Sequence, residues 1–146
     1  MKITIRRATK AEMYIIKGLD LLCFGDDACE LSQEQCDRSI WWLAFADGDP
    51  VAYTGAYIHD GTYMFLERTG VIPALRGQGL QKRLIQRRLA YARRKKVSNV
   101  YTYTAIDNWA SMNSLVSQGF RFYEPELDVF NGDYISYLYL RRILTY

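Results

Sequence analysis

The stretch Val71-Ile72-Pro73-Ala74-Leu75-Arg76-Gly77-Gln78-Gly79-Leu80 joins two segments of different hydrophobic periodicity and decides which fold the chain can adopt. Residues 62–71 predict a β-strand, and Pro73 helps to end that strand because it has no N–H. Beyond the glycines, apolar residues recur at the spacing of one helix face. That apolar stripe comprises Leu80, Leu84, Ile85, Leu89 and Ala92. The stretch therefore predicts a strand, a turn with two glycines and an amphipathic helix.

The turn over residues 76–81 has the composition of a backbone anion site. Glycines let backbone N–H groups point into a common concavity, and the N-terminus of the following helix adds roughly half a positive charge. A pyrophosphate suits this arrangement, with Arg76, Lys82 and Arg83 adding positive charge around it. A purely structural Gly-x-Gly turn explains the same residues. Neither Gly-Lys-Ser/Thr nor a GxGxxG with a following acidic residue is present, which argues against a P-loop and a dinucleotide fold.

The rest of the chain predicts one α/β domain over residues 1–146. Thr9 and Glu12 match a capping box before a helix over residues 10–22. Ser32, and then Asp107 or Asn108, are N-cap candidates for two further helices. The predicted strands cover residues 2–7, 40–46, 51–59, 62–71, 98–106, 120–123 and 134–142. Their order predicts a mixed, mostly antiparallel sheet with helices on both faces and a central parallel pair, formed by the strands that flank the basic helix.

Composition and charge narrow the class of protein. Hydrophobic content of 49% with 24% charged residues excludes a disordered chain. The net charge of +3 is uneven, because residues 61–100 carry ten Lys/Arg against Glu67 alone. Three cysteines and the single His59 form no metal-ligand pattern, so we expect no metal site and a reducing compartment. With no signal pattern and no apolar run of about 18 residues, we expect a cytoplasmic protein away from membranes.

Two motifs resemble the GCN5-related N-acetyltransferases, the GNAT family. The first is V-x-P-x-x-[RQ]-G-x-G-x-[GA] at the start of a long helix, and Gln81 departs from its last position. Its matching residues are Val71, Pro73, Arg76, Gly77, Gly79 and Leu80. The second is N-x-x-[SA]-(7 residues)-G-[FY], matched by Asn108, Ser111, Gly119 and Phe120. Strand order and length agree as well, so the resemblance covers essentially the whole chain.

The resemblance implies a fold in which the central parallel strands splay apart and acetyl-CoA binds along them. It also implies transfer of an acetyl or other short acyl group to an amine by direct attack on the thioester. The pantetheine arm would pair with the strand backbone near Val71 and pass Asn108, which explains a helix N-cap equally well. The implied cofactor-binding residues are Thr69, Gly70, Val71, Arg76, Gly77, Gln78, Gly79, Leu80, Gln81, Lys82, Asn108 and Ser111.

Catalytic residues are less evident. Where family members place a carboxylate on the second splayed strand, this chain has Tyr103, and where many place a tyrosine acid it has Leu115. Glu67 is the base candidate, since an isolated acid among apolar neighbours on the side of Thr69 and Val71 would have a raised pKa. An ion pair between Glu67 and a Lys or Arg is the alternative. Tyr103 either orients the amine or a water, or packs across strands.

The resemblance implies that the acceptor is an amine, on a small molecule or a peptide, and we expect a monomer or a homodimer. An acidic segment would suit a cationic amine, although a solvated surface explains it too. Its residues are Asp20, Asp26, Asp27, Glu30, Glu34 and Asp37. One alternative function is a CoA-binding module without turnover. Another is nucleic-acid binding by the basic helix over residues 82–96, which we do not expect, because its basic residues surround the helix and are not interleaved with exposed aromatics.

Overall fold

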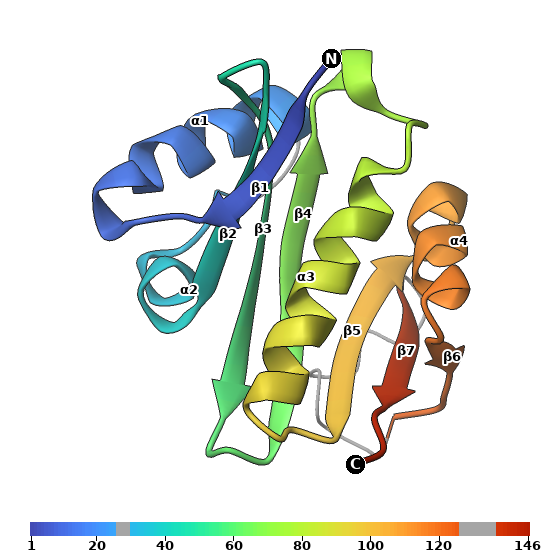
Figure 1. The fold of residues 1–146 in the computed structure, drawn as a ribbon. Coiled ribbons are helices and arrows are strands. Elements are labelled where there is room, and N and C mark those ends of the chain that lie inside the picture. The colour runs from blue at the N-terminus through green and yellow to red at the C-terminus, as the bar shows by residue number, and fades with distance from the viewer. Residues whose placement is uncertain (26–29, 126–136) are drawn as a thin grey trace. The chain divides into compact units, whose positions relative to one another are not determined.

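The computed structural model describes residues 1–25, 30–125 and 137–146 (Figure 1). The strands are β1 (Ile3–Arg7), β2 (Ile40–Ala46), β3 (Asp49–His59), β4 (Tyr63–Val71), β5 (Asn99–Ala105), β6 (Arg121–Phe122) and β7 (Tyr137–Ile143). The helices are η1 (Lys10–Glu12), α1 (Met13–Phe24), α2 (Gln33–Arg38), η3 (Pro73–Leu75), α3 (Leu80–Arg94) and α4 (Trp109–Ser117). The predicted order of strands and α-helices is confirmed. Part of the strand predicted over residues 134–142 lies outside the described residues.

The strands form a seven-stranded sheet in the order β1-β2-β3-β4-β5-β7-β6. β4 and β5 run parallel, as predicted, with pairs that run from Tyr63–Asn99 to Phe65–Tyr101. One residue further on, the Thr102 hydroxyl donates to the Leu66 carbonyl over 3.4 Å. β5 pairs with β7 on its other side along its whole length. β4 continues to Val71.

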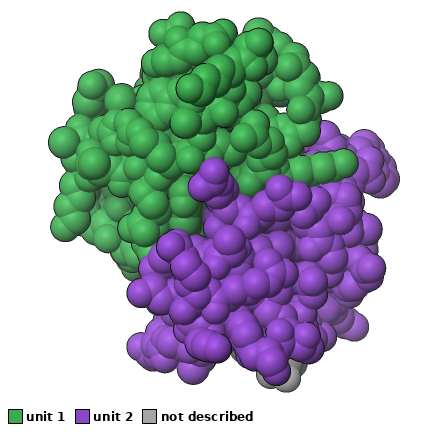
Figure 2. Space-filling model, viewed as in Figure 1, with its two compact units in different colours: residues 1–57, 67–84 green, residues 58–66, 85–146 purple. Residues whose placement is uncertain are grey.

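The chain divides into two compact units, coloured separately in Figure 2. Unit 1 comprises residues 1–57 and 67–84, and unit 2 comprises residues 58–66 and 85–146. The glycine turn and the first five residues of α3 belong to unit 1. The pairs between β4 and β5, and all of α4, belong to unit 2.

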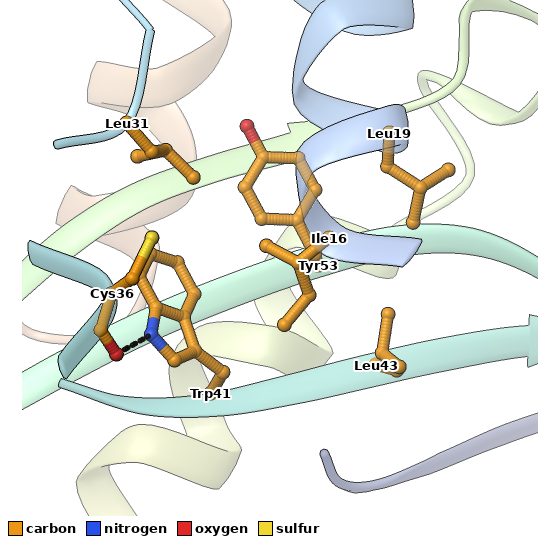
Figure 3. Packing of buried hydrophobic residues seen from close by; sticks show 7 residues of the cluster. All are labelled: Ile16, Leu19, Leu31, Cys36, Trp41, Leu43 and Tyr53. Atoms are coloured by element: carbon orange, nitrogen blue, oxygen red, sulfur yellow. Dashed lines mark hydrogen bonds between the residues drawn. The ribbon is translucent and has the colours of Figure 1, made fainter. Parts of the chain in front are cut away.

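The core of unit 1 forms where α1 and α2 pack on β2 and β3 (Figure 3). Its buried members are Ile16, Leu19, Leu31, Cys36, Trp41, Leu43 and Tyr53. The indole N–H of Trp41 donates to the Cys36 carbonyl over 3.2 Å. Ser32 starts α2 as predicted, because its hydroxyl accepts the Gln35 N–H while the Gln35 side chain accepts the Ser32 N–H. These contacts fix α2 next to the start of β2.

Two predicted helix details in the chain differ from the structure. Thr9 and Glu12 do interact, with the Thr9 N–H donating to the Glu12 carboxylate over 2.9 Å, but they open a 3-10 turn and α1 begins at Met13. The helix predicted over residues 10–22 therefore starts later and runs two residues longer. In α4, Met112 and Leu115 are buried and Val116 is exposed. The predicted apolar stripe of α3 is buried throughout.

Candidate functional site

The glycine turn is held in unit 1 by contacts at its two flanks. The Ile72 N–H donates to the Val51 carbonyl over 3.0 Å, which ties the end of β4 to β3. Pro73–Leu75 then form one 3-10 turn. The Arg76 side chain folds back, and its Nε donates to the Val71 carbonyl over 2.9 Å. The turn therefore reaches the start of α3 from a fixed strand end.

Gly77 and Gly79 are required by the backbone conformation. Their φ angles are 78° and 80°, in the left-handed region that side chains disfavour. A Cβ on either glycine would meet no heavy atom within 4 Å. Crowding is therefore not the reason for glycine here, and the space beside both residues is open to a ligand.

The turn presents unpaired donors in a positive environment. Within the described residues, the backbone N–H groups of residues 77–80 have no hydrogen-bond acceptor. They lie at the N-terminus of the fifteen-residue helix α3, whose first turn contains no acidic residue. Arg76, Lys82 and Arg83 are all exposed around them. Open amides, a helix dipole and three cations together can hold a polyanion such as a pyrophosphate.

Three of the implied cofactor residues have no side chain that is free to contact a ligand. Leu80 is buried in the core, at 5% exposure. The Thr69 hydroxyl bonds to that of Thr54 over 2.6 Å. Gly70 lies so close to the ring of Tyr53 that it has no room for a side chain. At these positions only the backbone remains available to a ligand.

Glu67 is buried but not isolated. Its carboxylate accepts a 2.8 Å bond from Arg38 Nη2, with further bonds from the Gln35 amide over 3.2 Å and the Ser39 hydroxyl over 3.4 Å. Arg38 also stacks on the ring of Tyr57, with its guanidinium carbon 4.3 Å from the ring centroid. The prediction of an isolated acid is wrong, and the alternative of an ion pair is confirmed. No spacing in the sequence indicated Arg38, which lies 29 residues away.

A second buried charge centre lies beside it in unit 1. Arg68 Nη1 donates to both carboxylate oxygens of Asp20, over 3.0 and 2.9 Å, and the Tyr53 hydroxyl donates to the same carboxylate. Burial and the hydrogen bond to Asp20 raise the pKa of Tyr53 far above its ordinary value. Asp20 belongs to the acidic segment, for which the sequence left open a site for a cationic amine or a solvated surface. Neither alternative holds for Asp20, because its carboxylate is internal and paired.

These contacts show that side-chain alternation along β4 slips by one residue at Glu67 and Arg68. Both side chains reach the helices that cover the Tyr53 face of β3, Glu67 reaching α2 and Arg68 reaching α1. Thr69 instead meets Thr54, which points to the opposite face. The prediction that Glu67 and Thr69 share one side of the sheet is therefore wrong.

The site residues of unit 2 are arranged on β5 and α4. Tyr103 is 43% exposed, and its ring packs against those of Phe65 and Tyr137, with centroids 5.8 and 4.9 Å apart. Asn108 caps α4, because its side-chain oxygen accepts the Ser111 N–H over 3.2 Å. The amide nitrogen of Asn108 has no partner among the described residues, so it keeps two donors for a ligand. Leu115 is a core residue at 4% exposure.

Other sequence-based expectations concern charge and metal binding. Arg88 was assigned to the basic surface for nucleic acid, but it is buried at 2% exposure, and burial lowers its pKa to about 9. Of the predicted acidic segment, Asp26 and Asp27 lie outside the described residues. No group of three His, Cys, Asp or Glu in the described part of the chain could hold a metal ion. No helix within the described ranges is both long and apolar enough to cross a membrane.

Comparison with known proteins identifies the family. The model of the acetyltransferase (GNAT) family matches residues 11–120, more than half of the 146 residues. No curated protein matches the chain in sequence. Solved structures with the same fold include a GNAT family acetyltransferase from Elizabethkingia anophelis with acetyl-CoA bound, at TM-score 0.80 and 20% identity over 97% of this chain and 98% of that one.

Two further structures have the same fold. The ribosomal-protein-S18-alanine N-acetyltransferase from Escherichia coli matches with TM-score 0.78 and 14% identity, covering 99% of this chain and 96% of that one. The PaiA N-acetyltransferase from Thermoplasma acidophilum, in complex with coenzyme A, matches with TM-score 0.75 and 13% identity, over 99% and 100%. The chain belongs to the acetyltransferase (GNAT) family, as the two sequence motifs implied. It is accordingly an acyl-CoA-dependent N-acyltransferase.

Proposed function

We propose that this member of the GNAT family holds the pyrophosphate of acetyl-CoA on the backbone N–H groups of residues 77–80. The observation that carries the proposal is the set of unpaired amides at the N-terminus of α3, beside two glycines in the left-handed region. Arg76 and Lys82 add charge, and Gln81 and Gln78 border the same turn. Because each amide is held by the fold before the ligand arrives, little ordering entropy is lost on binding.

We further propose that the acyl arm of the cofactor lies along the backbone of residues 69–71. An extended amide chain can bind a strand through main-chain hydrogen bonds, and the sequence motif at Val71 implies such a contact at the end of β4. The Thr69 hydroxyl is bonded to Thr54 of β3, and Gly70 has no side chain and packs against Tyr53, which supports a purely backbone contact. Asn108 and Ser111 are the proposed contacts from α4.

Gly79→Glu tests the cofactor site. A side chain at this residue strains the left-handed backbone, and a carboxylate beside the amides repels the pyrophosphate. We expect acetyl-CoA to raise the melting temperature of the parent protein and not that of the variant, measured by thermal shift. Gly61→Glu is the matched control, because Gly61 also has a positive φ, of 70°, but lies in the β3–β4 hairpin. Equal acetyl-CoA shifts in all three proteins would refute the site.

For the chemical step, we propose Glu67 as the proton acceptor, with Arg38 as its positioning residue. The acyl-CoA supplies the thioester. The amine nitrogen forms a bond to its carbonyl carbon, the carbon–sulfur bond breaks, and the amine's proton passes to Glu67, while the departing thiolate takes a proton from solvent. Tyr103, half-exposed on β5, is proposed to orient the amine. A positioned proton acceptor contributes roughly 10²–10⁴-fold to the rate.

Glu67→Gln keeps the shape of this residue and removes its basicity. We expect kcat to fall by at least about a hundredfold, with the KM for acetyl-CoA unchanged, in an assay of free-thiol release with an amine panel. Tyr103→Phe should raise the KM of the amine more than it lowers kcat. An unchanged kcat in Glu67→Gln would remove Glu67 from the mechanism without affecting the cofactor site.

The acceptor is proposed to be an amine on a small molecule or a peptide. Of the acidic segment, Glu30, Glu34 and Asp37 remain as exposed candidates for contacts with a cationic acceptor.

We also propose that residues 1–146 act as one domain, since the family match runs through both units. A cytoplasmic monomer or homodimer is the proposed form. Mass spectrometry of the products from an amine panel identifies the acceptor class.

A further inference from the structure

Unit 1 contains a cavity of about 530 Å³ that the acyl-transfer chemistry does not use. It lies where the end of β1, the first turns of α1, α2 and the start of β2 meet. Trp41 in its wall pairs with Gly55 of β3, whereas Val51 of the same strand binds the glycine turn through Ile72. Four strand residues correspond to about 13 Å. The cavity is therefore separate from the proposed pyrophosphate site.

The cavity has an excess of positive charge. Arg7, Lys10, Lys17 and Arg38 line it, against a single acid, Asp37. That acid is already engaged, because its Oδ1 accepts a 2.8 Å bond from the Gln33 amide. Lys10 and Lys17 have no ion-pair partner within the described residues, so their charges are not compensated by the fold. Uncompensated cations around a concave site favour an anionic ligand.

The remaining lining combines the polar residues Thr9, Gln33 and Ser39 with a group of apolar side chains. Met13, Ile40 and the largely buried Trp41 contribute to it. The Trp41 indole N–H is directed to the Cys36 carbonyl, as Figure 3 shows, so its ring is held in one orientation. The volume falls within the range of sites that hold small organic ligands. Cations and apolar side chains in one lining match a ligand with one carboxylate and a small apolar body.

Arg38 connects this cavity with Glu67. Its guanidinium bonds to Glu67 over 2.8 Å, yet its side chain is 37% exposed and lines the cavity. A guanidinium has five N–H donors, and the hydrogen bonds to Glu67 and Glu34 occupy only some of them. A second carboxylate in the cavity would therefore share Arg38 with Glu67 and weaken its hold on that residue.

We propose that the cavity binds a small organic carboxylate whose apolar body lies against Trp41, and that this carboxylate competes with Glu67 for Arg38. Binding needs only unit 1 and is independent of acyl transfer. Only an effect of the bound carboxylate on turnover rests on the proposed role of Glu67. The site thus provides a route by which an anionic metabolite regulates the enzyme.

Benzoate, with neutral benzamide as its isostere, tests the proposal in the full chain without acyl-CoA. The readout is the indole N–H resonance of Trp41 in two-dimensional NMR, assigned among the three tryptophans by Trp42→Phe and Trp109→Phe. We expect benzoate to move this resonance saturably, and benzamide and inorganic phosphate to bind at least about tenfold more weakly, because each lacks one of the two recognition features. Equal binding of benzoate and benzamide would overturn the anion site, and equal binding of phosphate would overturn the apolar wall.

Variants locate the contacts. Lys10→Gln with Lys17→Gln should weaken benzoate binding about tenfold, whereas Lys2→Gln, at an exposed residue just before β1 and outside the lining, should leave it unchanged. Glu67→Gln should tighten benzoate severalfold, since it releases Arg38. Parent-like affinity in the lysine double variant refutes the site, and parent-like affinity in Glu67→Gln refutes the competition. Because no acyl-CoA is present, these failures are distinguishable from a failure of the proposed function.

Discussion

Gly70→Ala tests the packing that connects the cofactor strand with the core. Gly70 is the penultimate residue of β4 and is buried against the ring of Tyr53. A Cβ at this residue would press on Cε1 of that ring, and would lie 3.0 Å from its Cζ and 3.1 Å from the Cys23 sulfur. Carbon contacts this short are repulsive, so either the ring or the strand must move.

Tyr53 has little freedom to move. Its side chain is fully buried at 0% exposure, its hydroxyl donates to Asp20, and its ring lies 6.3 Å from that of Trp41 between centroids. Overpacking in such a core lowers the free energy of unfolding by about 1–3 kcal/mol. Gly70→Ala also disturbs a buried hydrogen bond, so we expect a destabilisation of about 2 kcal/mol, in the middle of that range. For a chain of this size that corresponds to a fall in Tm of roughly 6 °C.

Thermal and urea unfolding followed by circular dichroism measure this change. Gly18→Ala is the matched control, because Gly18 lies within α1 and a Cβ there meets no atom within 4 Å. The same chemical change should stabilise the protein by about 0.5–1 kcal/mol at this position, since glycine is a poor helix former. If Gly70→Ala is as stable as the parent protein while Gly18→Ala has the expected higher stability, the proposed steric conflict at Gly70 is refuted.

Three further predictions concern charge and capping. Arg6 lowers the pKa of Glu12 from 4.5 to about 2, chiefly by a side-chain hydrogen bond. The stabilisation from this pair is present above the pKa of Glu12 in the unfolded chain and is lost as the pH falls toward 2. Arg6→Gln should therefore destabilise the folded protein at pH 6 and have little effect at pH 2, measured by urea unfolding at each pH. Arg38→Gln leaves the Glu67 carboxylate buried without its cation and should lower the free energy of unfolding by about 2–3 kcal/mol. This is less than the roughly 3–5 kcal/mol expected for a fully buried pair, because two neutral donors to Glu67 remain. The double variant with Glu67→Gln should recover part of the lost stability, and no recovery would contradict the ion pair. Asn108→Ala should lower the free energy of unfolding by about 1 kcal/mol, because the helix cap is lost. Asn108→Asp keeps the oxygen that caps α4 but removes the amide donors. A raised KM for acetyl-CoA in Asn108→Asp, with the stability of the parent protein, therefore assigns these donors to the ligand.

Features that depend on near neighbours in the chain are predicted well from the sequence. Gly77 and Gly79 adopt the left-handed conformation that the turn before α3 requires, and the apolar stripe of that helix is buried. Ser32 and Asn108 cap their helices as expected. Each of these outcomes follows from φ preferences, helical spacing or a hydrogen bond across three residues, all of which are written in a short window of sequence.

The residues around Glu67, the proposed proton acceptor, could not be predicted in this way. Glu67 is paired with Arg38, 29 residues away, and Asp20 with Arg68, 48 residues away. Strict alternation along β4 put Glu67 on the side of Thr69, and the one-residue slip of the strand reversed that orientation. A slip of one residue moves a side chain to the other face of the sheet, and no pattern in the neighbouring sequence predicts where such a slip occurs.

The glycine turn, its helix and the family were therefore determined by the sequence alone, because they rest on backbone conformation and on motifs confined to a few residues. The tertiary structure alone decided which charges are buried together, that Thr69 and Gly70 offer only their backbone, and that Arg38 stands between Glu67 and a cationic cavity. The physical reason is that the free energy of an ion pair depends on burial and on partners from distant segments, which only the packed chain brings together.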